Sequence, residues 1–201
     1  MLKKIALSIF LVITLAIVAV LSIAATRPPT YHVERSQSMG ATPEVVFAVV
    51  NDLHRFREWS PWQKLDPAMK VTFEGPSSGV GASYSWVGND QVGEGRMTTT
   101  DATPPGSLTQ KLEFLKPFKS ECMVHFTIAP ENDGSRVTWA IDGNNNYVSK
   151  VMCLFVSMDS MMGKDFVSGL ANLKQVAEAE PPPAAPGTQA SASGMSAPAK
   201  P

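Results

Sequence analysis

The chain has 201 residues, enough for one folded domain with short appendages. Its formal net charge is -1, and the sequence contains no run of basic residues. Both observations argue against a nucleic-acid-binding protein. Only two cysteines are present, Cys122 and Cys153, so a disulfide framework is excluded and a single bond between them stays open.

The N-terminal segment, residues 1–30, is expected to be a signal anchor with a short linker. Lys3 and Lys4 precede an apolar run over residues 5–25, which is long enough to cross a bilayer as a helix. A cleaved signal peptide is the alternative, because Ser22 and Ala24 are small enough for a weak cleavage site. The length of the run favours the anchor.

The positive-inside rule predicts the orientation of this anchor. Lys3 and Lys4 would hold the N-terminus in the cytoplasm, so the following domain would lie on the periplasmic or extracellular side. Few residues separate the apolar run from Tyr31, and we therefore expect a single-pass membrane protein whose domain stays close to the lipid surface.

The first part of the domain reads as a strand followed by two short helices. Residues 31–39 are expected to form the strand, which Gly40 ends. Thr42 and Pro43 are typical of a helix start, and a second helical segment over residues 53–59 ends before Pro61.

Residues 70–145 alternate between apolar and polar positions, with turn residues about every ten residues. This pattern predicts an antiparallel sheet with one apolar face. We expect strands over residues 71–74, 82–87, 93–102, 108–118, 120–130 and 135–143. The inward-facing side chains would be Val71, Phe73, Tyr84, Trp86, Met97, Leu108, Gln110, Leu112, Phe114, Cys122, Val124, Phe126, Ile128, Val137, Trp139 and Ile141.

Residues 146–178 carry the longest helical pattern and predict one continuous amphipathic helix. Gly163 and Gly169 interrupt it, which indicates either close packing against a neighbour or a hinge over a cavity. The apolar stripe recurs at steps of three and four residues and consists of Val151, Phe155, Met158, Met162, Phe166, Leu170, Leu173 and Val176. Residues 179–201, rich in Pro, Ala and Ser, are expected to be disordered.

The order of these elements, and several segments, resemble the SRPBCC or START-like superfamily with its helix-grip fold. The segments include ATPEVVFAVVNDLHRFREWSPW (residues 41–62), GVGASYSWVGN (residues 79–89) and GKDFVSGLANLKQVAE (residues 163–178). The closest likeness is to the group described as polyketide cyclase/dehydrase and lipid transport. The resemblance covers residues 31–178 and implies an α+β fold in which a curved antiparallel sheet wraps a long C-terminal helix.

The resemblance also implies an apolar cavity between the sheet and that helix, which would hold a lipid or another hydrophobic small molecule. No cofactor is expected, and no metal site, because His32, His54 and His125 lack ligand spacing. The residues expected to line the cavity are Trp62, Tyr84, Trp86, Met97, Gln110, Leu112, Phe114, Phe126, Trp139, Phe155, Met158 and Met162.

Two other functions stay open. A cyclase or dehydrase could use Tyr84, Glu94, Arg96 or Gln110 as acid, base or dipole, although Glu94 and Arg96 are better explained as a solvated ion pair. We therefore assign no catalytic residue. An envelope interaction module, with the proline-rich tail as its contact segment, is the second possibility.

Overall fold

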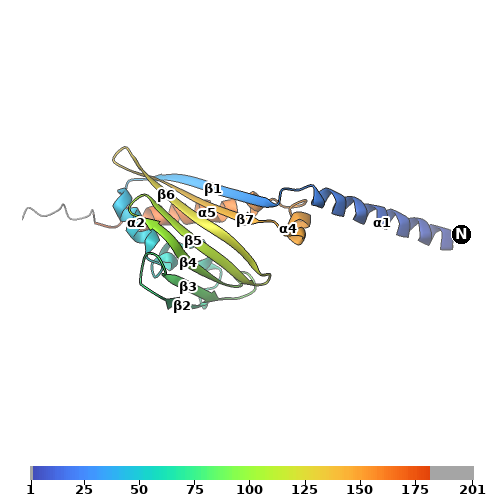
Figure 1. Cartoon of the computed structure of the whole chain (residues 1–201), viewed down its shortest axis with the longest axis horizontal. Helices are drawn as coiled ribbons and strands as arrows, with labels where there is room; N and C mark the ends of the chain where they lie inside the picture. The colour runs from blue at the N-terminus through green and yellow to red at the C-terminus, as the bar shows by residue number, and fades with distance from the viewer. Residues whose placement is uncertain (1, 182–201) are drawn as a thin grey trace, which may run out of the picture.

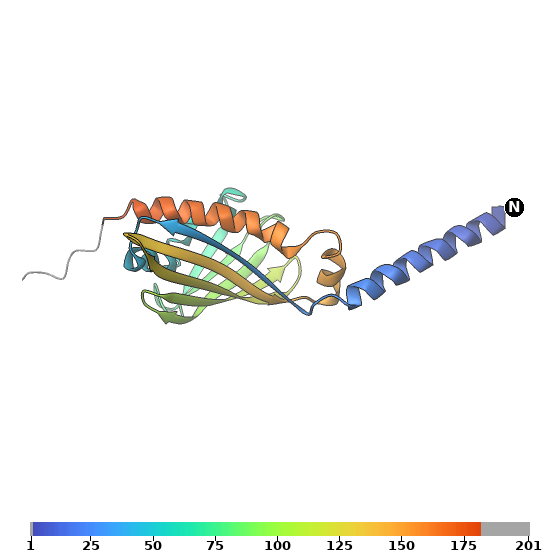
Figure 2. The ribbon, with the colours of Figure 1, turned by 90° about the horizontal axis from the view of Figure 1, so that it is seen from above.

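The computed structural model describes residues 2–181, and Figures 1 and 2 show it in two views. The predicted disordered tail, residues 179–201, lies almost wholly outside the described residues. In chain order the elements are α1 (Leu2–Ala25), β1 (Thr30–Met39), α2 (Pro43–Asn51), α3 (Phe56–Trp59), the 3-10 helix η1 (Pro61–Lys64), β2 (Lys70–Glu74), β3 (Ser83–Val87), β4 (Glu94–Thr103), β5 (Ser107–Lys116), β6 (Ser120–Glu131), β7 (Gly134–Asn144), α4 (Tyr147–Met152) and α5 (Met158–Glu178).

Within the described residues, seven strands form one antiparallel sheet in the order β1-β7-β6-β5-β4-β3-β2. The sheet curves, and α5 runs along one of its faces (Figure 2). This is the α+β helix-grip arrangement, and the prediction of fold class is confirmed. Each predicted strand is present, with ends that shift by one or two residues.

The sheet presents its apolar side chains to α5, as the period-two pattern predicted. In the register of β6 with β7, Phe126 lies opposite Trp139 and Val124 opposite Ile141, and all four side chains are buried. On β6 the alternate residues are more accessible: Met123 and His125 are half-buried, and Thr127 is exposed. Every second side chain along these strands is buried, and together these side chains form the main core between the sheet and α5.

The prediction of one continuous helix over residues 146–178 is wrong. Two helices form instead, because two polar side chains cap separate helix starts. Asn146 accepts a hydrogen bond from the Ser149 backbone N–H at 2.8 Å, and Ser157 accepts one from the Ser160 N–H at 3.1 Å. Residues 153–157 lie between the helices, so Phe155 leaves the apolar stripe and is 78% exposed.

Close packing explains Gly169. A Cβ atom at this position would lie 2.6 Å from the Trp139 ring and 3.3 Å from Pro61, so glycine lets α5 approach the sheet. Gly163 faces the Arg35 guanidinium with equally little room. Cys122 is buried, Cys153 is half-buried, and both are free thiols.

The described residues include one helix, α1, that is long and apolar enough to cross a membrane, over Lys3–Ala25. It projects away from the domain at the end where β1 begins (Figure 1). A signal sequence meets the same criteria. The membrane-anchor prediction is therefore taken up below as a proposal.

We predict that Gly169→Ala lowers the free energy of unfolding by about 1 to 3 kcal/mol, because the added methyl overpacks the contact with Trp139. Ser168→Ala is the matched control, since Ser168 is exposed on the same helix and the change only improves helix propensity. Thermal and chaotrope unfolding of the purified chain would measure both. An equally stable Gly169→Ala variant would contradict the close-packing explanation.

Candidate functional site

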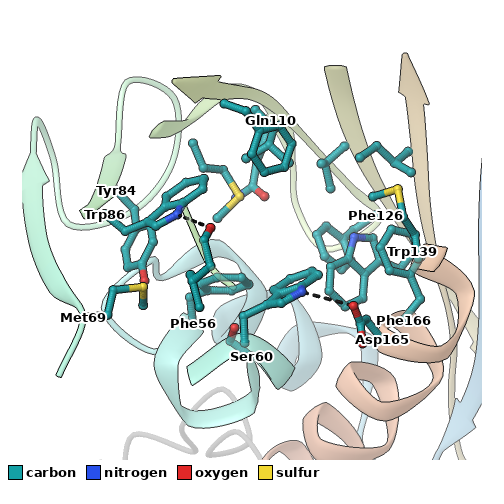
Figure 3. Close-up of a pocket in the computed structure, with 18 of the residues that line it drawn as sticks. Phe56, Ser60, Met69, Tyr84, Trp86, Gln110, Phe126, Trp139, Asp165 and Phe166 are labelled. Carbon is teal, nitrogen blue, oxygen red and sulfur yellow. Dashed lines mark hydrogen bonds between the residues drawn. The ribbon is translucent and has the colours of Figure 1, made fainter. Parts of the chain in front are cut away.

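A cavity of about 200 Å³ lies between the concave face of the sheet, α5 and the short helices before β2 (Figure 3). The residues around it are mostly aromatic or aliphatic. They are Phe56, Ser60, Trp62, Met69, Tyr84, Trp86, Gln91, Val92, Met97, Gln110, Leu112, Phe114, Val124, Phe126, Trp139, Ile141, Met162, Asp165 and Phe166.

Strand alternation builds the floor of this cavity. Gln110, Leu112 and Phe114 are alternate residues of β5, so their side chains point to the same face of the sheet. The antiparallel register places Gln110 opposite Val124 of β6, which adds a further apolar side chain beside the amide. Secondary structure alone thus places these side chains around one space.

An aromatic stack fixes the distance between α5 and the sheet. The rings of Trp139 on β7 and Phe166 on α5 are parallel within 5°, with centroids 4.3 Å apart. On the other side Trp139 stacks on Phe126 at 5.3 Å, and Trp59 meets it edge to face. Such pairs contribute about 0.5 to 1.5 kcal/mol each beyond their buried area. They form a rigid wall on one side of the cavity.

The opposite wall depends on a glycine. Trp86 on β3 lies across Gly95 of β4, where a side chain would collide with the indole ring. The Trp86 indole N–H donates to the Val92 carbonyl at 3.4 Å, which ties the ring to the β3–β4 connection (Figure 3). Trp86 is therefore held flat beside the cavity.

A polar contact spans the edge of the cavity between η1 and α5. The Trp62 indole N–H donates to the Asp165 carboxylate at 3.2 Å (Figure 3). Both residues are half-buried, as is Met162 one turn earlier on α5, while Gln91 is exposed. These partly accessible residues mark the mouth of the cavity.

Gln110 is the most deeply buried polar side chain on the cavity wall. It is 2% exposed, and it borders the cavity. The Gln110 amide is therefore available to a polar group inside the cavity.

Two titratable side chains, Tyr84 and Asp165, line the cavity in the part of the chain that the structure describes. Burial raises the pKa of Tyr84 to about 12, against a smaller opposing effect of the Arg57 charge. The phenol is neutral near pH 7 and can donate a hydrogen bond. Asp165 lies at the mouth, bonded to Trp62.

The predicted site residues divide into two groups. Phe155 lies exposed in the turn between α4 and α5, and Met158 packs against the main core at the start of α5 without lining the cavity. The other ten border the cavity: Trp62, Tyr84, Trp86, Met97, Gln110, Leu112, Phe114, Phe126, Trp139 and Met162.

Sequence reasoning missed several lining residues. Phe56, Ser60 and Met69 come from the short helices and the loop after them, where no periodicity indicates a direction. Asp165 is not one of the apolar stripe residues of its helix, and Gln91 belongs to a hairpin loop. An acidic residue at a helix edge carries no signal that separates a cavity mouth from solvent.

The other two candidate catalytic residues, Glu94 and Arg96, do not line the cavity. Arg96 pairs with Glu74 and donates to the Ser85 hydroxyl, and Glu94 pairs with Lys116. Arg96 thus pairs with a residue of β2, on the far side of β3, and Glu94 pairs with a residue of the neighbouring β5, so the two do not pair with each other. Partly exposed pairs of this kind contribute little to stability.

Comparison with solved structures shows the same fold at low sequence identity. Protein CV1439 from Chromobacterium violaceum matches 77% of this chain and 100% of its own, with 14% identity and a TM-score of 0.52. Protein MLL2253 from Mesorhizobium loti covers 74% and 97%, with 16% identity and a TM-score of 0.55. The di-domain ARO/CYC BexL from the BE-7585A biosynthetic pathway covers 80% and 54%, with 13% identity and a TM-score of 0.54.

None of the curated proteins matches the chain in sequence. The sequence model of one protein family does, over residues 30–178, and that family is described as polyketide cyclase/dehydrase and lipid transport. The match covers the whole region from β1 to the end of α5. The chain therefore belongs to the polyketide cyclase/dehydrase and lipid transport family.

Proposed function

We propose that this chain is a membrane-anchored binding module that holds a hydrophobic small molecule or a single lipid chain between the sheet and α5, without transforming it. The observation that carries the proposal is the cavity itself, an aromatic and aliphatic enclosure whose wall includes the buried amide of Gln110. Binding sites for small molecules combine apolar walls with a few placed polar groups in this way.

The size of the cavity restricts its occupant. Pockets for drug-sized ligands usually measure about 300 to 1,000 Å³, whereas this cavity measures about 200 Å³. One acyl chain or one ring system suits this volume better than a phospholipid with two chains. The Gln110 amide would then bind a carbonyl, hydroxyl or carboxyl group on an otherwise apolar molecule.

The chemistry of the lining favours binding over a cyclase or dehydrase reaction. Acid–base catalysis works best with a group whose pKa lies near the working pH. Burial moves the pKa of Tyr84 away from that range, and Glu94 and Arg96 form ion pairs outside the cavity. The ARO/CYC likeness supports the enzyme alternative through the fold only.

The apolar helix α1 supports the membrane part of the proposal. Its length suits a bilayer, and Lys3 and Lys4 would keep its first residues in the cytoplasm. The domain would then lie on the periplasmic or extracellular side. Our first test is the intact mass of the chain from isolated membranes, which we expect to include α1; a species that begins near residue 26 would contradict anchoring.

Closing the mouth of the cavity should remove the bound molecule. We expect Met162→Trp to reduce the amount of co-purifying hydrophobic ligand severalfold, since Met162 lines the cavity and a larger ring would fill it. Met161→Trp is the matched control, because Met161 is the exposed neighbour on the same helix and does not border the cavity. Native mass spectrometry after gentle extraction measures occupancy. Wild-type protein that is always empty, or equal occupancy in both variants, would contradict the proposal.

Gln110→Leu separates a ligand-binding role of the amide from a structural one. Because the amide is buried on an apolar cavity wall, its replacement by leucine should raise the free energy of unfolding by roughly 1 kcal/mol. The same change should weaken binding of decanoic acid about tenfold, the cost of one lost hydrogen bond. Gln91→Leu, at the exposed mouth, is the control. A Gln110→Leu variant that is strongly destabilised would show that the amide serves the fold.

A further inference from the structure

The connection between α1 and the domain is fastened at several points. The backbone N–H of Asn145 donates to the Pro29 carbonyl at 2.8 Å, and its side-chain amide contacts the carbonyls of Pro28 and Thr30 at 3.4 and 3.3 Å. These bonds join the linker after α1 to the segment after β7. The linker therefore has a defined conformation next to the sheet.

Helix α4 packs directly against the end of α1. The Tyr147 hydroxyl donates to the Leu21 carbonyl at 2.8 Å, and Ala24 is fully buried at this junction. Both views show α4 beside the point where α1 leaves the domain (Figures 1 and 2). Helix α1 thus sets which end of the domain faces a membrane that α1 crosses.

That end carries a cluster of exposed apolar side chains on α4 and the turn after it. Phe155 is the most exposed of them, and the others are Tyr147, Val148, Met152 and Val156. Contiguous exposed apolar groups on a soluble surface mark a contact site. The α1 junction beside them indicates that the contact is with lipid.

The β5–β6 hairpin adds a second apolar group at the same end. The start of β6 pairs with the end of β7, Cys122 opposite Gly143, and Gly143 in turn lies opposite Tyr31 near the start of β1. The hairpin tip thus lies at the end from which α1 leaves. It exposes Leu115 and Phe118, and Phe118 is 70% exposed.

Basic residues accompany both apolar groups. Lys119 lies beside Phe118, Lys150 is on α4, and Arg27 follows α1. The nearest exposed acid on β6, Glu121, pairs with Lys111. Aromatic and aliphatic side chains with nearby cations are typical of surfaces that enter the headgroup layer of a membrane.

We propose that residues 147–157 and the β5–β6 tip, residues 115–119, form a lipid-facing patch. This patch enters the headgroup layer of the leaflet through which α1 emerges, so the domain docks on the bilayer. The inference rests on the membrane-anchored function proposed above. It adds the surface by which the domain meets lipid and the direction in which the cavity faces.

Docking through this patch places the mouth of the cavity close to the lipid. Met162 and Asp165 lie in the first two turns of α5, directly after the patch. Gln91 and Val92 belong to the β3–β4 connection, which the pairing of Glu94 with Lys116 puts at the same end of the sheet. A hydrophobic molecule could then pass between bilayer and cavity over a short path.

The test uses the full chain in vesicles of phosphatidylcholine and phosphatidylglycerol, with Cys122→Ala and Cys153→Ser as background. An environment-sensitive fluorophore is attached at Phe155→Cys, or at Val80→Cys as the matched control. Val80 is also apolar and 60% exposed, but it lies in the β2–β3 connection at the opposite end of the sheet. We expect headgroup-linked nitroxide lipids to quench the label at position 155 severalfold more than the label at position 80.

Emission at position 155 that resembles the label in water, with quenching equal to that at position 80, would overturn the patch. A second measurement labels Phe118→Cys and adds Val148→Asp and Val156→Asp. These charges should reduce quenching at position 118 severalfold, while α1 keeps the chain in the membrane. Unchanged quenching would also overturn the proposal. Native mass spectrometry of the same samples reports ligand occupancy separately, so an empty cavity would count against the binding function alone.

Discussion

The cavity depends on the contact of Trp139 with α5. The indole ring lies between Phe126 on the sheet and Phe166 on the helix, and Gly169 leaves room for its edge. Aromatic rings in van der Waals contact resist compression, so they hold the helix at a fixed distance from β7. The gap next to this stack cannot close unless the stack itself is rearranged.

The two halves of α5 have different surroundings. In its C-terminal half, Leu170, Leu173 and Ala177 are buried in the main core, which anchors the helix. In its N-terminal half, Met162, Asp165 and Phe166 border the cavity. Both halves of the helix thus contribute buried side chains to the main core, and Phe166 also lines the cavity.

The sheet was predictable because alternation is a local signal that the folded structure preserves. From Val71 to Ile141, parity alone placed side chains on the correct face, and the register then brought Gln110, Trp139 and their neighbours around one space. The helix break was not predictable in the same way. Val151, Phe155 and Met158 keep helical spacing through it, and the deciding interaction is the side-chain cap at Ser157.

The sequence predicted Trp62 and Met162 at the cavity, but the contact of Trp62 with Asp165 at the mouth was not predictable, for a related reason. Trp62 and Asp165 are more than a hundred residues apart and meet through one hydrogen bond. Neither position has a periodic signal, because their places depend on how η1 packs against α5 after the sheet has formed. The burial of side chains within one strand or helix could be predicted from its hydrophobic pattern. A contact between two separate segments, such as η1 and α5, could be seen only in the tertiary structure.

The wrong prediction at Phe155 concerns the end of the domain next to α1. An apolar side chain at helical spacing would normally be buried in the core, yet the turn between α4 and α5 leaves it exposed beside the helix that precedes the domain. The apolar pattern of residues 147–158 therefore has two different physical causes within a few residues. Met158 is apolar because it packs on the core, while Phe155 has no partner within the described protein that would account for its character. In the proposed docking, a lipid surface next to α1 would supply such a partner.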